Sequence, residues 1–270
     1  MSMRSEMRAN VAAFEQTLRS TIALAETFEA ADWARPTECP GWSVQDVTAH
    51  MVGTETMLLG EDPAGGHVLA AVPAHVRNDL GRLIETVVDA RRGRRGEEVL
   101  AELRDVLDRR LAVLADLDPE KPITAPTGRT VPYAEFMVFR VFDCWAHEQD
   151  IRRAVGRPGN LDGPAAERAR RILEPGLPMV VAKRAGAAAG QVVVFEISEP
   201  LPFTSRIRVG DDGRARLVDD PAEGDATLRM DWETFLRLAA GRCGPEAVKV
   251  GTEGDTALAA RILANMALTP

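Results

Sequence analysis

Residues 139–152 read FRVFDCWAHEQDIR, and this stretch decides how the rest of the chain is interpreted. Its pattern predicts one amphipathic helix. Asp143 and His147 lie four residues apart, a spacing that stacks two side chains on one face of a helix. A carboxylate and an imidazole on one face suit zinc, and they equally suit a surface pair worth roughly a few tenths of a kcal/mol. Spacing alone leaves both interpretations open.

Other segments before residue 160 also show helical periodicity, which indicates a helical bundle whose sites form between facing helices. They lie at residues 5–30, 43–58, 76–87, 99–114 and 133–155. A loop with two prolines and a glycine, residues 37–42, precedes the second of these helices. Ser43 and Asp46 then form a capping-box-like pair that starts the helix carrying His50. Residues 121–132, rich in proline and threonine, are expected to be a connector.

The pattern changes after about residue 160. Strands are predicted at residues 191–197, 203–209, 214–218 and 226–230, with Asp211-Asp212-Gly213 as a hairpin turn. Helices are predicted at residues 164–175, 232–240 and 255–266. We therefore expect an α+β protein with a helical bundle over residues 1–160 and a smaller α+β domain over residues 161–270.

Composition excludes several classes of partner. Acidic residues outnumber basic ones by 41 to 33, giving a net charge of −8, so no nucleic-acid partner is expected. The first residues contain charges throughout and no apolar h-region, and no apolar run approaches membrane-spanning length, so we expect no signal peptide and no membrane partner. Three isolated cysteines fit a reducing compartment. We expect a cytoplasmic protein.

The chain contains four histidines that can be weighed as metal ligands. His67 and His75 flank a loose segment rich in proline and glycine, and we interpret both as solvated loop residues. His50 lies beside an apolar stripe inside a helix, where it is either a buried, hydrogen-bonded histidine or a ligand. Arg140, one turn before Asp143, is either its orienting partner or half of a surface salt bridge. Asp46 either holds the ring N–H of His50 or only caps its helix.

Two separated motifs resemble signatures of a known family. Residues 39–50, CPGWSVQDVTAH, look like the CPGW-x-V-x-D-x-x-x-H signature of the mycothiol-dependent maleylpyruvate isomerase family, a branch of the DinB-like metal-binding four-helix bundles. Residues 140–152 resemble its second signature. Gly241-Arg242 and residues 251–260 are similar to its C-terminal domain, which resembles sterol-carrier folds.

The resemblance implies that His50, Asp143 and His147 hold a divalent metal, typically zinc. The isomerase uses glutamate where this chain has Asp143. Arg242, and by a looser positional analogy Arg82, would contact substrate carboxylates, which a guanidinium binds bidentately. Glu148 is a poorer ligand candidate because it points about 100° around the helix from His147, and Cys144 is expected to be a small core residue.

The function implied is metal-dependent chemistry with mycothiol, the low-molecular-weight thiol of actinobacteria, as cofactor or cosubstrate. Its thiolate would add to an electrophilic small-molecule substrate, as in an isomerase or an S-transferase. The alternatives are a thiol-independent metal-dependent hydrolase or biosynthetic tailoring enzyme of the same fold, and a non-catalytic module that binds a small ligand. A monomer or a homodimer is expected.

Overall fold

The computed structural model describes residues 2–219 and 223–269, and the chain divides into two compact units, Met1–Asn160 and Leu161–Pro270. The first unit is helical and the second contains a sheet, so the predicted α+β class is confirmed. In the described ranges no helix is long and apolar enough to cross a membrane.

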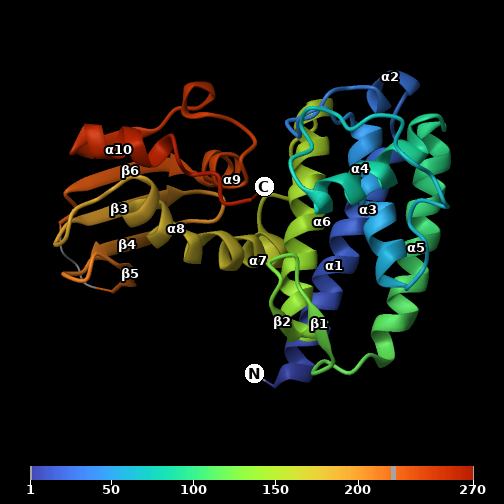
Figure 1. Ribbon diagram of the computed structural model, residues 1–270, viewed down its shortest axis with the longest axis horizontal. Helices are drawn as coiled ribbons and strands as arrows, with labels where there is room; N and C mark the ends of the chain where they lie inside the picture. The colour runs from blue at the N-terminus through green and yellow to red at the C-terminus, as the bar shows by residue number, and fades with distance from the viewer. Residues whose placement is uncertain (1, 220–222, 270) are drawn as a thin grey trace. The chain divides into compact units, whose positions relative to one another are not determined.

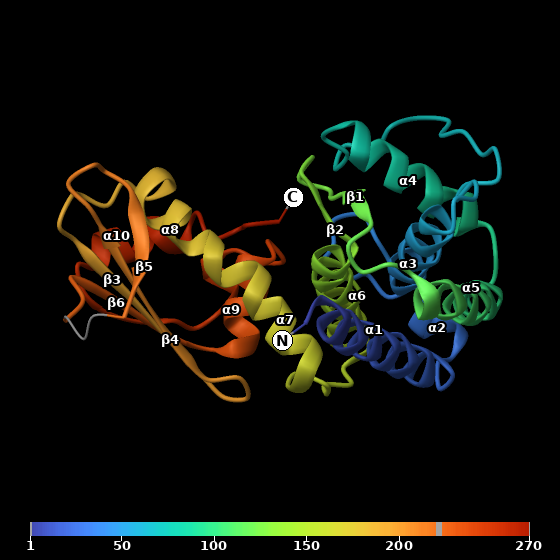
Figure 2. The same ribbon diagram turned by 90° about the horizontal axis from the view of Figure 1, so that it is seen from below.

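The first unit is a bundle in which four long helices run side by side, with a fifth against one of them (Figures 1 and 2). The bundle helices are α1 (Met3–Ala25), α3 (Val44–Leu58), α5 (Gly96–Asp116) and α6 (Tyr133–Val155). Helix α4 (Asp79–Arg92) packs on α3, and the short α2 (Ala30–Trp33) lies between α1 and α3 in the chain. Apolar residues at helical spacing fill the centre, and Phe14, Leu103 and Val141 are fully buried.

The predicted connector is more ordered than expected. Residues 121–132 contain a small antiparallel hairpin of β1 (Pro122–Thr124) and β2 (Thr130–Pro132). The turn between the two strands contains Gly128, whose φ of 79° is in the left-handed region that glycine enters at little cost. The prolines do not prevent pairing because such short edge segments need few ladder hydrogen bonds.

The second unit is a five-stranded sheet in the order β5-β4-β3-β6-β7, and β3 and β6 are parallel while the other neighbours are antiparallel. The strands are β3 (Val192–Ser198), β4 (Phe203–Val209), β5 (Ala215–Val218), β6 (Ala226–Asp231) and β7 (Gly251–Gly254). In β4 the predicted alternation is confirmed, since Phe203, Ser205, Ile207 and Val209 are buried and the residues between them are not.

Of the helical segments in the second unit, α8 (Leu177–Met179), α9 (Trp232–Ala239) and α10 (Thr256–Leu263) pack on this sheet, in which Val193, Phe195 and Leu228 are fully buried. The others are α7 (Gly163–Leu173), the 3₁₀ turns Glu174–Gly176 and Pro245–Ala247, and the π-helical turn Val180–Arg184. The helical path therefore continues past Pro175, where the sequence predicts an end. Proline is accepted there because it begins a new short segment, whose first N–H groups would lack partners anyway.

Candidate metal centre

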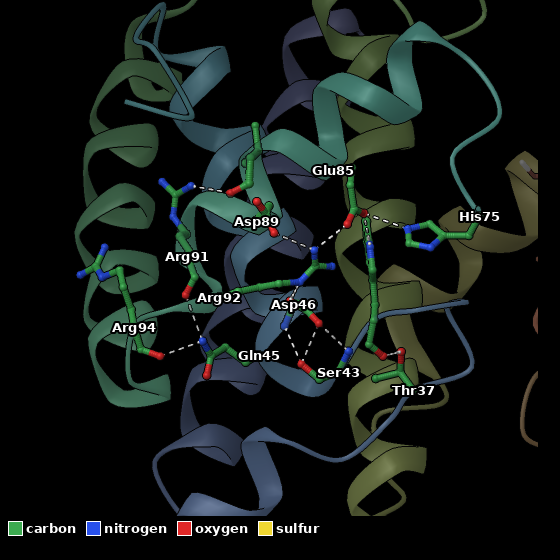
Figure 3. Close-up of polar contacts among 12 residues, drawn as sticks. Thr37, Ser43, Gln45, Asp46, His75, Glu85, Asp89, Arg91, Arg92 and Arg94 are labelled. Atoms are coloured by element: carbon green, nitrogen blue, oxygen red, sulfur yellow. Dashed lines mark hydrogen bonds and ion pairs between the residues drawn. The ribbon is translucent and has the colours of Figure 1, made fainter. Parts of the chain in front are cut away.

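Two helices carry the residues that form the centre. Helix α3 begins at a capping box, in which Ser43 Oγ accepts from the Asp46 backbone N–H at 3.2 Å and Asp46 Oδ2 accepts from the Ser43 N–H at 2.9 Å (Figure 3). His50 follows one turn after Asp46 and is 6% exposed. Helix α6 ends at Gly156 in the left-handed conformation and places Asp143 and His147 one turn apart. A sharp start and a long regular helix thus fix where the three side chains lie.

The structure brings the three predicted ligands together. His50 Nε2 lies 3.4 Å from Asp143 Oδ2, and His147 Nε2 lies 3.8 Å from Asp143 Oδ1. One nitrogen or oxygen from each residue lies within 4.8 Å of the others. The side chains are 7%, 20% and 8% exposed for His50, Asp143 and His147, so Asp143 and His147 are not a solvated surface pair.

The geometry of His50 and Asp143 fits a divalent metal independently of any resemblance to a family. His50 Nε2 is buried and has no hydrogen-bond partner among the described residues, although a buried polar atom without a partner is costly. Its distance to Asp143 Oδ2, 3.4 Å, matches two ligand atoms about 2.0–2.1 Å from a tetrahedral zinc, which lie about 3.3–3.5 Å apart. A cation between these atoms would satisfy the unpaired nitrogen.

Arg140 orients the Asp143 carboxylate through a hydrogen-bonded ion pair. The Arg140 Nη1 donates to Asp143 Oδ2 at 2.7 Å, and Arg140 is 2% exposed, so the orienting role fits and the surface salt bridge does not. Arg140 Nη2 in turn donates to Glu55 Oε1 at 2.6 Å and to Cys144 Sγ at 3.3 Å. Glu55 also accepts from Arg110 Nε at 2.7 Å, which makes a buried network of two arginines and two carboxylates.

His147 is oriented by two residues that the sequence interpretation missed. Its Nδ1 lies 3.1 Å from Asp150 Oδ2, and Cys39 Sγ donates to the same oxygen at 3.2 Å. Cys39 Sγ is also 4.0 Å from His147 Nδ1, so Cys39, His147 and Asp150 form a second group with metal-ligand geometry. The position of Asp150 three residues after His147 on a helix was the available signal, because residues at i and i+3 are neighbours.

The charges differ between the two histidines. Burial lowers the pKa of His50, and nearby His147 and Arg140 lower it further. Asp143 raises it, but the net pKa of His50 lies below the ordinary value. Burial also lowers the pKa of His147, but its contacts with Asp150, Cys39 and Asp143 outweigh burial and raise the pKa to about 10. Burial raises the pKa of Asp143, but Arg140 and the histidines hold it well below the ordinary value. Without a metal, the cluster at neutral pH therefore contains a carboxylate, a neutral His50 and a protonated His147.

An aromatic wall completes the centre. The ring of Trp42 lies 5.3 Å from that of His50 and 6.2 Å from that of His147, measured between centroids. Its indole N–H donates to Glu85 Oε2 at 2.9 Å. Trp145 on α6 is fully buried, and its indole N–H donates to the Asn160 carbonyl at 2.7 Å.

Comparisons with known proteins identify the family. Residues 14–152 match the profile of the mycothiol maleylpyruvate isomerase N-terminal domain, and residues 167–261 match that of the MDMPI C-terminal domain. The chain belongs to the mycothiol maleylpyruvate isomerase family. The expected resemblance is thus confirmed, and the family is one of enzymes.

Solved structures support the fold of this family. The chain is similar to a crystal structure of the mycothiol-dependent maleylpyruvate isomerase, with 15% identity, a TM-score of 0.56 and coverage of 94% of this chain and 93% of the other. A mutant of that isomerase with a histidine replaced by alanine matches with a TM-score of 0.54, 15% identity and the same coverage. No curated protein sequence matches significantly.

The two arginines expected at the substrate lie in different units of the chain. Arg82 is exposed on α4. Arg242 lies in the second unit, half-buried, and donates to the Ala240 carbonyl at 2.9 Å. Their roles stay predictions.

The other side chains weighed from the sequence have defined places. Asp46 caps α3 and bonds Arg92 Nε at 3.1 Å, and no contact of Asp46 with the ring of His50 is found in the described ranges. Cys144 is fully buried, as expected of a core residue. Glu148 is also fully buried but bonds Ser20 and Asn160, away from the ligands. The solvated interpretation was wrong for His75, which is only partly exposed and bonds Glu85; His67 is exposed but pairs with Asp89.

Proposed function

We propose that His50, Asp143 and His147 bind one divalent metal ion, zinc, and that the chain is a mycothiol-dependent isomerase of an electrophilic small molecule. The observation that carries the proposal is the buried, unpaired Nε2 of His50 directed at Asp143 in a chain of this family. Mycothiol and the isomerase reaction are taken from the names of the family and of its solved members.

The first task of the protein's own residues is to keep the ligands in the right protonation state. The Asp150 carboxylate accepts from His147 Nδ1, which keeps a proton on that nitrogen and leaves Nε2 as the ligand atom. Arg140 holds Asp143 as a carboxylate with one oxygen directed at each histidine. A metal ion bound here would supply a Lewis acid that lowers the pKa of a coordinated thiol or water.

The second task is to limit water at the centre. The Trp42 ring covers the two histidines, and the bundle buries them almost completely. A low-dielectric wall strengthens the interaction of the ligands with any charge that enters. We expect the thiol and the substrate to reach the centre past Trp42, because that ring is only half-buried.

We assign the metal-binding function to residues 1–160 and the smaller sterol-carrier-like α+β domain to residues 161–270. We expect a cytoplasmic enzyme, because three isolated cysteines fit a reducing compartment.

Metal analysis and thiol titration test the proposal. The purified chain is expected to contain about one zinc per molecule, a stoichiometry lost in His50→Ala and His147→Ala. His67→Ala is the matched control, because His67 lies in an exposed loop and should keep the metal. The metal site would be contradicted if the wild-type protein purified without metal and were as stable as the protein supplied with zinc.

Mycothiol separates the reaction classes. An isomerase needs the thiol but regenerates it, so a substoichiometric amount should support many turnovers. Consumption of one mycothiol per product would indicate an S-transferase instead. Absence of binding at millimolar thiol to the zinc-loaded chain would favour thiol-independent chemistry, and metal binding without activity on electrophilic substrates would favour a binding module.

A further inference from the structure

Glu85 on α4 joins three separate segments of the chain at one buried carboxylate. Its side chain is 1% exposed. It accepts from Trp42 Nε1 at 2.9 Å and from His75 Nε2 at 2.9 Å, both at Oε2. Arg92 Nη1 lies 2.7 Å from Oε1, and Figure 3 shows the contacts of Glu85 with His75 and Arg92. Burial raises the pKa of Glu85, but these three donors outweigh it and hold the pKa below the ordinary value.

The Trp42 contact links Glu85 to the candidate metal centre. The indole that donates to Glu85 is the ring that lies over His50 and His147. The opposite end of the same residue is fixed as well, because the Trp42 carbonyl accepts from Thr37 Oγ1 at 2.8 Å. Glu85 therefore holds the indole end of Trp42, whose backbone carbonyl is already held by Thr37.

The His75 contact links the same carboxylate to the long loop at residues 59–78. The His75 ring lies on the backbone of Gly41, where an added Cβ would be 2.6 Å from Nδ1, and Gly41 has a φ of 79°. Only glycine permits both this close approach and this backbone conformation. Two further contacts fasten the loop to α4, His67 Nε2 to Asp89 Oδ2 at 2.7 Å and Arg91 Nη1 to the Pro63 carbonyl at 2.8 Å.

The Arg92 contact reaches the start of α3. Arg92 Nε donates to Asp46 Oδ1 at 3.1 Å, and Asp46 is the capping residue that begins the helix of His50 (Figure 3). Trp42, the loop at residues 59–78 and the start of α3 are therefore all connected to the ion pair of Glu85 and Arg92.

We propose that Glu85 is a positioning residue that holds the Trp42 indole over the ligand histidines and docks the loop at residues 59–78 beside it, so that Trp42 and this loop form the thiol-binding side of the centre. The proposal rests on the proposed function for the identity of the thiol. The placement of Trp42 by Glu85 does not depend on which thiol binds, and it can be measured without any thiol.

Two readouts on the full-length chain test this inference. The first is acrylamide quenching of Trp42 fluorescence, obtained by subtracting the Trp42→Phe counterpart of each variant because the chain has four tryptophans. The second is calorimetric titration of the zinc-loaded protein with mycothiol. In Glu85→Ala, quenching of Trp42 should rise about twofold or more as the ring loses its anchor.

Mycothiol affinity should fall about tenfold in Glu85→Ala, in line with the loss of a hydrogen bond to a charged group. Zinc affinity should stay within about threefold, because no ligand is removed. Glu85→Gln should keep Trp42 quenching near the wild-type value, since its amide oxygen can still accept from the indole. Asp79→Ala is the matched control on the same helix, because Asp79 is exposed in the first turn of α4 and no contact of its side chain with Trp42 or His75 is found in the described ranges.

Some outcomes would overturn the inference. Unchanged quenching of Trp42 in Glu85→Ala would do so. An equal rise in quenching in Asp79→Ala, or a rise in Glu85→Ala with unchanged mycothiol affinity, would do so as well. If Glu85→Ala does not fold, Glu85→Asp serves instead, because it keeps the charge and withdraws the acceptor from Trp42. If the wild type binds neither zinc nor mycothiol, the proposed function fails, and the quenching of the metal-free variants still decides whether Glu85 places Trp42.

Discussion

Two buried polar clusters lie side by side in the bundle, and they differ in how well their members satisfy one another. In the first, made of His50, Asp143 and His147, the ligand nitrogens lie 3.4 and 3.8 Å from the shared carboxylate, and one of them has no hydrogen-bond partner. In the second, Glu55 is bonded by Arg110 and Arg140 at 2.7 and 2.6 Å.

In the second cluster the charges pair with one another, although Arg110 Nη1 has no hydrogen-bond partner among the described residues. Two arginines face the two carboxylates of Glu55 and Asp143, and Arg110 also donates to Tyr133 Oη at 2.9 Å. Such a network is costly to bury but costlier to break, because removing one member leaves an unpaired charge. In the first cluster the buried His50 Nε2 has no hydrogen-bond partner among the described residues, and this cluster is the one we assign to a ligand.

The comparison shows that burial and charge alone do not mark a binding site. Both clusters are buried and ionised, and Asp143 belongs to both. The distinguishing feature is that one nitrogen or oxygen from each of His50, Asp143 and His147 lies within 4.8 Å of the others, with His50 Nε2 lacking a hydrogen-bond partner. Variants of the two clusters should therefore have opposite effects on stability and on metal affinity.

Removal of Glu55 is expected to have the largest effect, and it should act on stability. Glu55→Ala leaves two buried arginines without their shared partner, so the free energy of unfolding should fall by about 3–5 kcal/mol. Denaturant unfolding measures this. Glu15→Ala is the control, because Glu15 forms an exposed pair with Arg19 worth about 0.3–0.5 kcal/mol. A loss below about 1 kcal/mol in Glu55→Ala would remove the distinction between the clusters.

Removal of His50 should have the opposite effect. His50→Ala deletes a ligand whose Nε2 makes no hydrogen bond. The free energy of unfolding of the metal-free protein should therefore change by no more than about 1–2 kcal/mol. Zinc affinity should fall by more than about a hundredfold, beyond the effect expected of an orienting partner. Calorimetry and unfolding on the same preparations compare the two quantities. Large destabilisation with unchanged zinc affinity would mean that His50 is a core residue.

Asp150 should have an intermediate effect. Asp150→Asn keeps the shape of the side chain but removes the charge that orients His147, so zinc affinity should fall about 10–100-fold. Cys39→Ser, which changes only the second contact to Asp150, should weaken zinc binding much less. If Cys39→Ser abolished binding and His50→Ala did not, the metal would belong to the group of Cys39, His147 and Asp150.

The pH dependence should be the smallest and most gradual effect. A metal must replace the proton on His147, whose pKa is raised to about 10, whereas His50, with a lowered pKa, is already neutral. Zinc affinity should therefore rise by about tenfold per pH unit from pH 6 to 8, with release of about one proton. In the metal-free protein the same raised pKa stabilises the fold fully below the ordinary value of 6.5, and this contribution is lost as pH rises towards 10. Calorimetry in buffers of different ionisation enthalpy counts the proton, and none released would contradict the charge state described.

The sequence predicts those parts of the cluster that depend on local spacing. Asp143 and His147 share a face because they are four residues apart on one helix, and the capping box before His50 is visible in the letters. The partnership of His50 with α6 came from resemblance to a family, because no local pattern joins residues 50 and 143.

The parts that could not be predicted depend on tertiary contacts. Glu55, Arg110 and Arg140 come from three different helices, and each alone fits a solvated helix face. Strand β7 has the sequence Gly-Thr-Glu-Gly, which lacks alternation, and it exists because its register with β6 supplies the hydrogen bonds. His75 looks like a loop residue until α4 brings Glu85 beside it.

The central claim is tested most directly by a crystal structure of the zinc-loaded chain with anomalous diffraction at the zinc absorption edge. The account predicts one strong peak at about 2.0–2.2 Å from His50 Nε2, from a carboxylate oxygen of Asp143 and from His147 Nε2. A peak among Cys39, Asp150 and His147 Nδ1, or no peak in either group of the loaded protein, would contradict it.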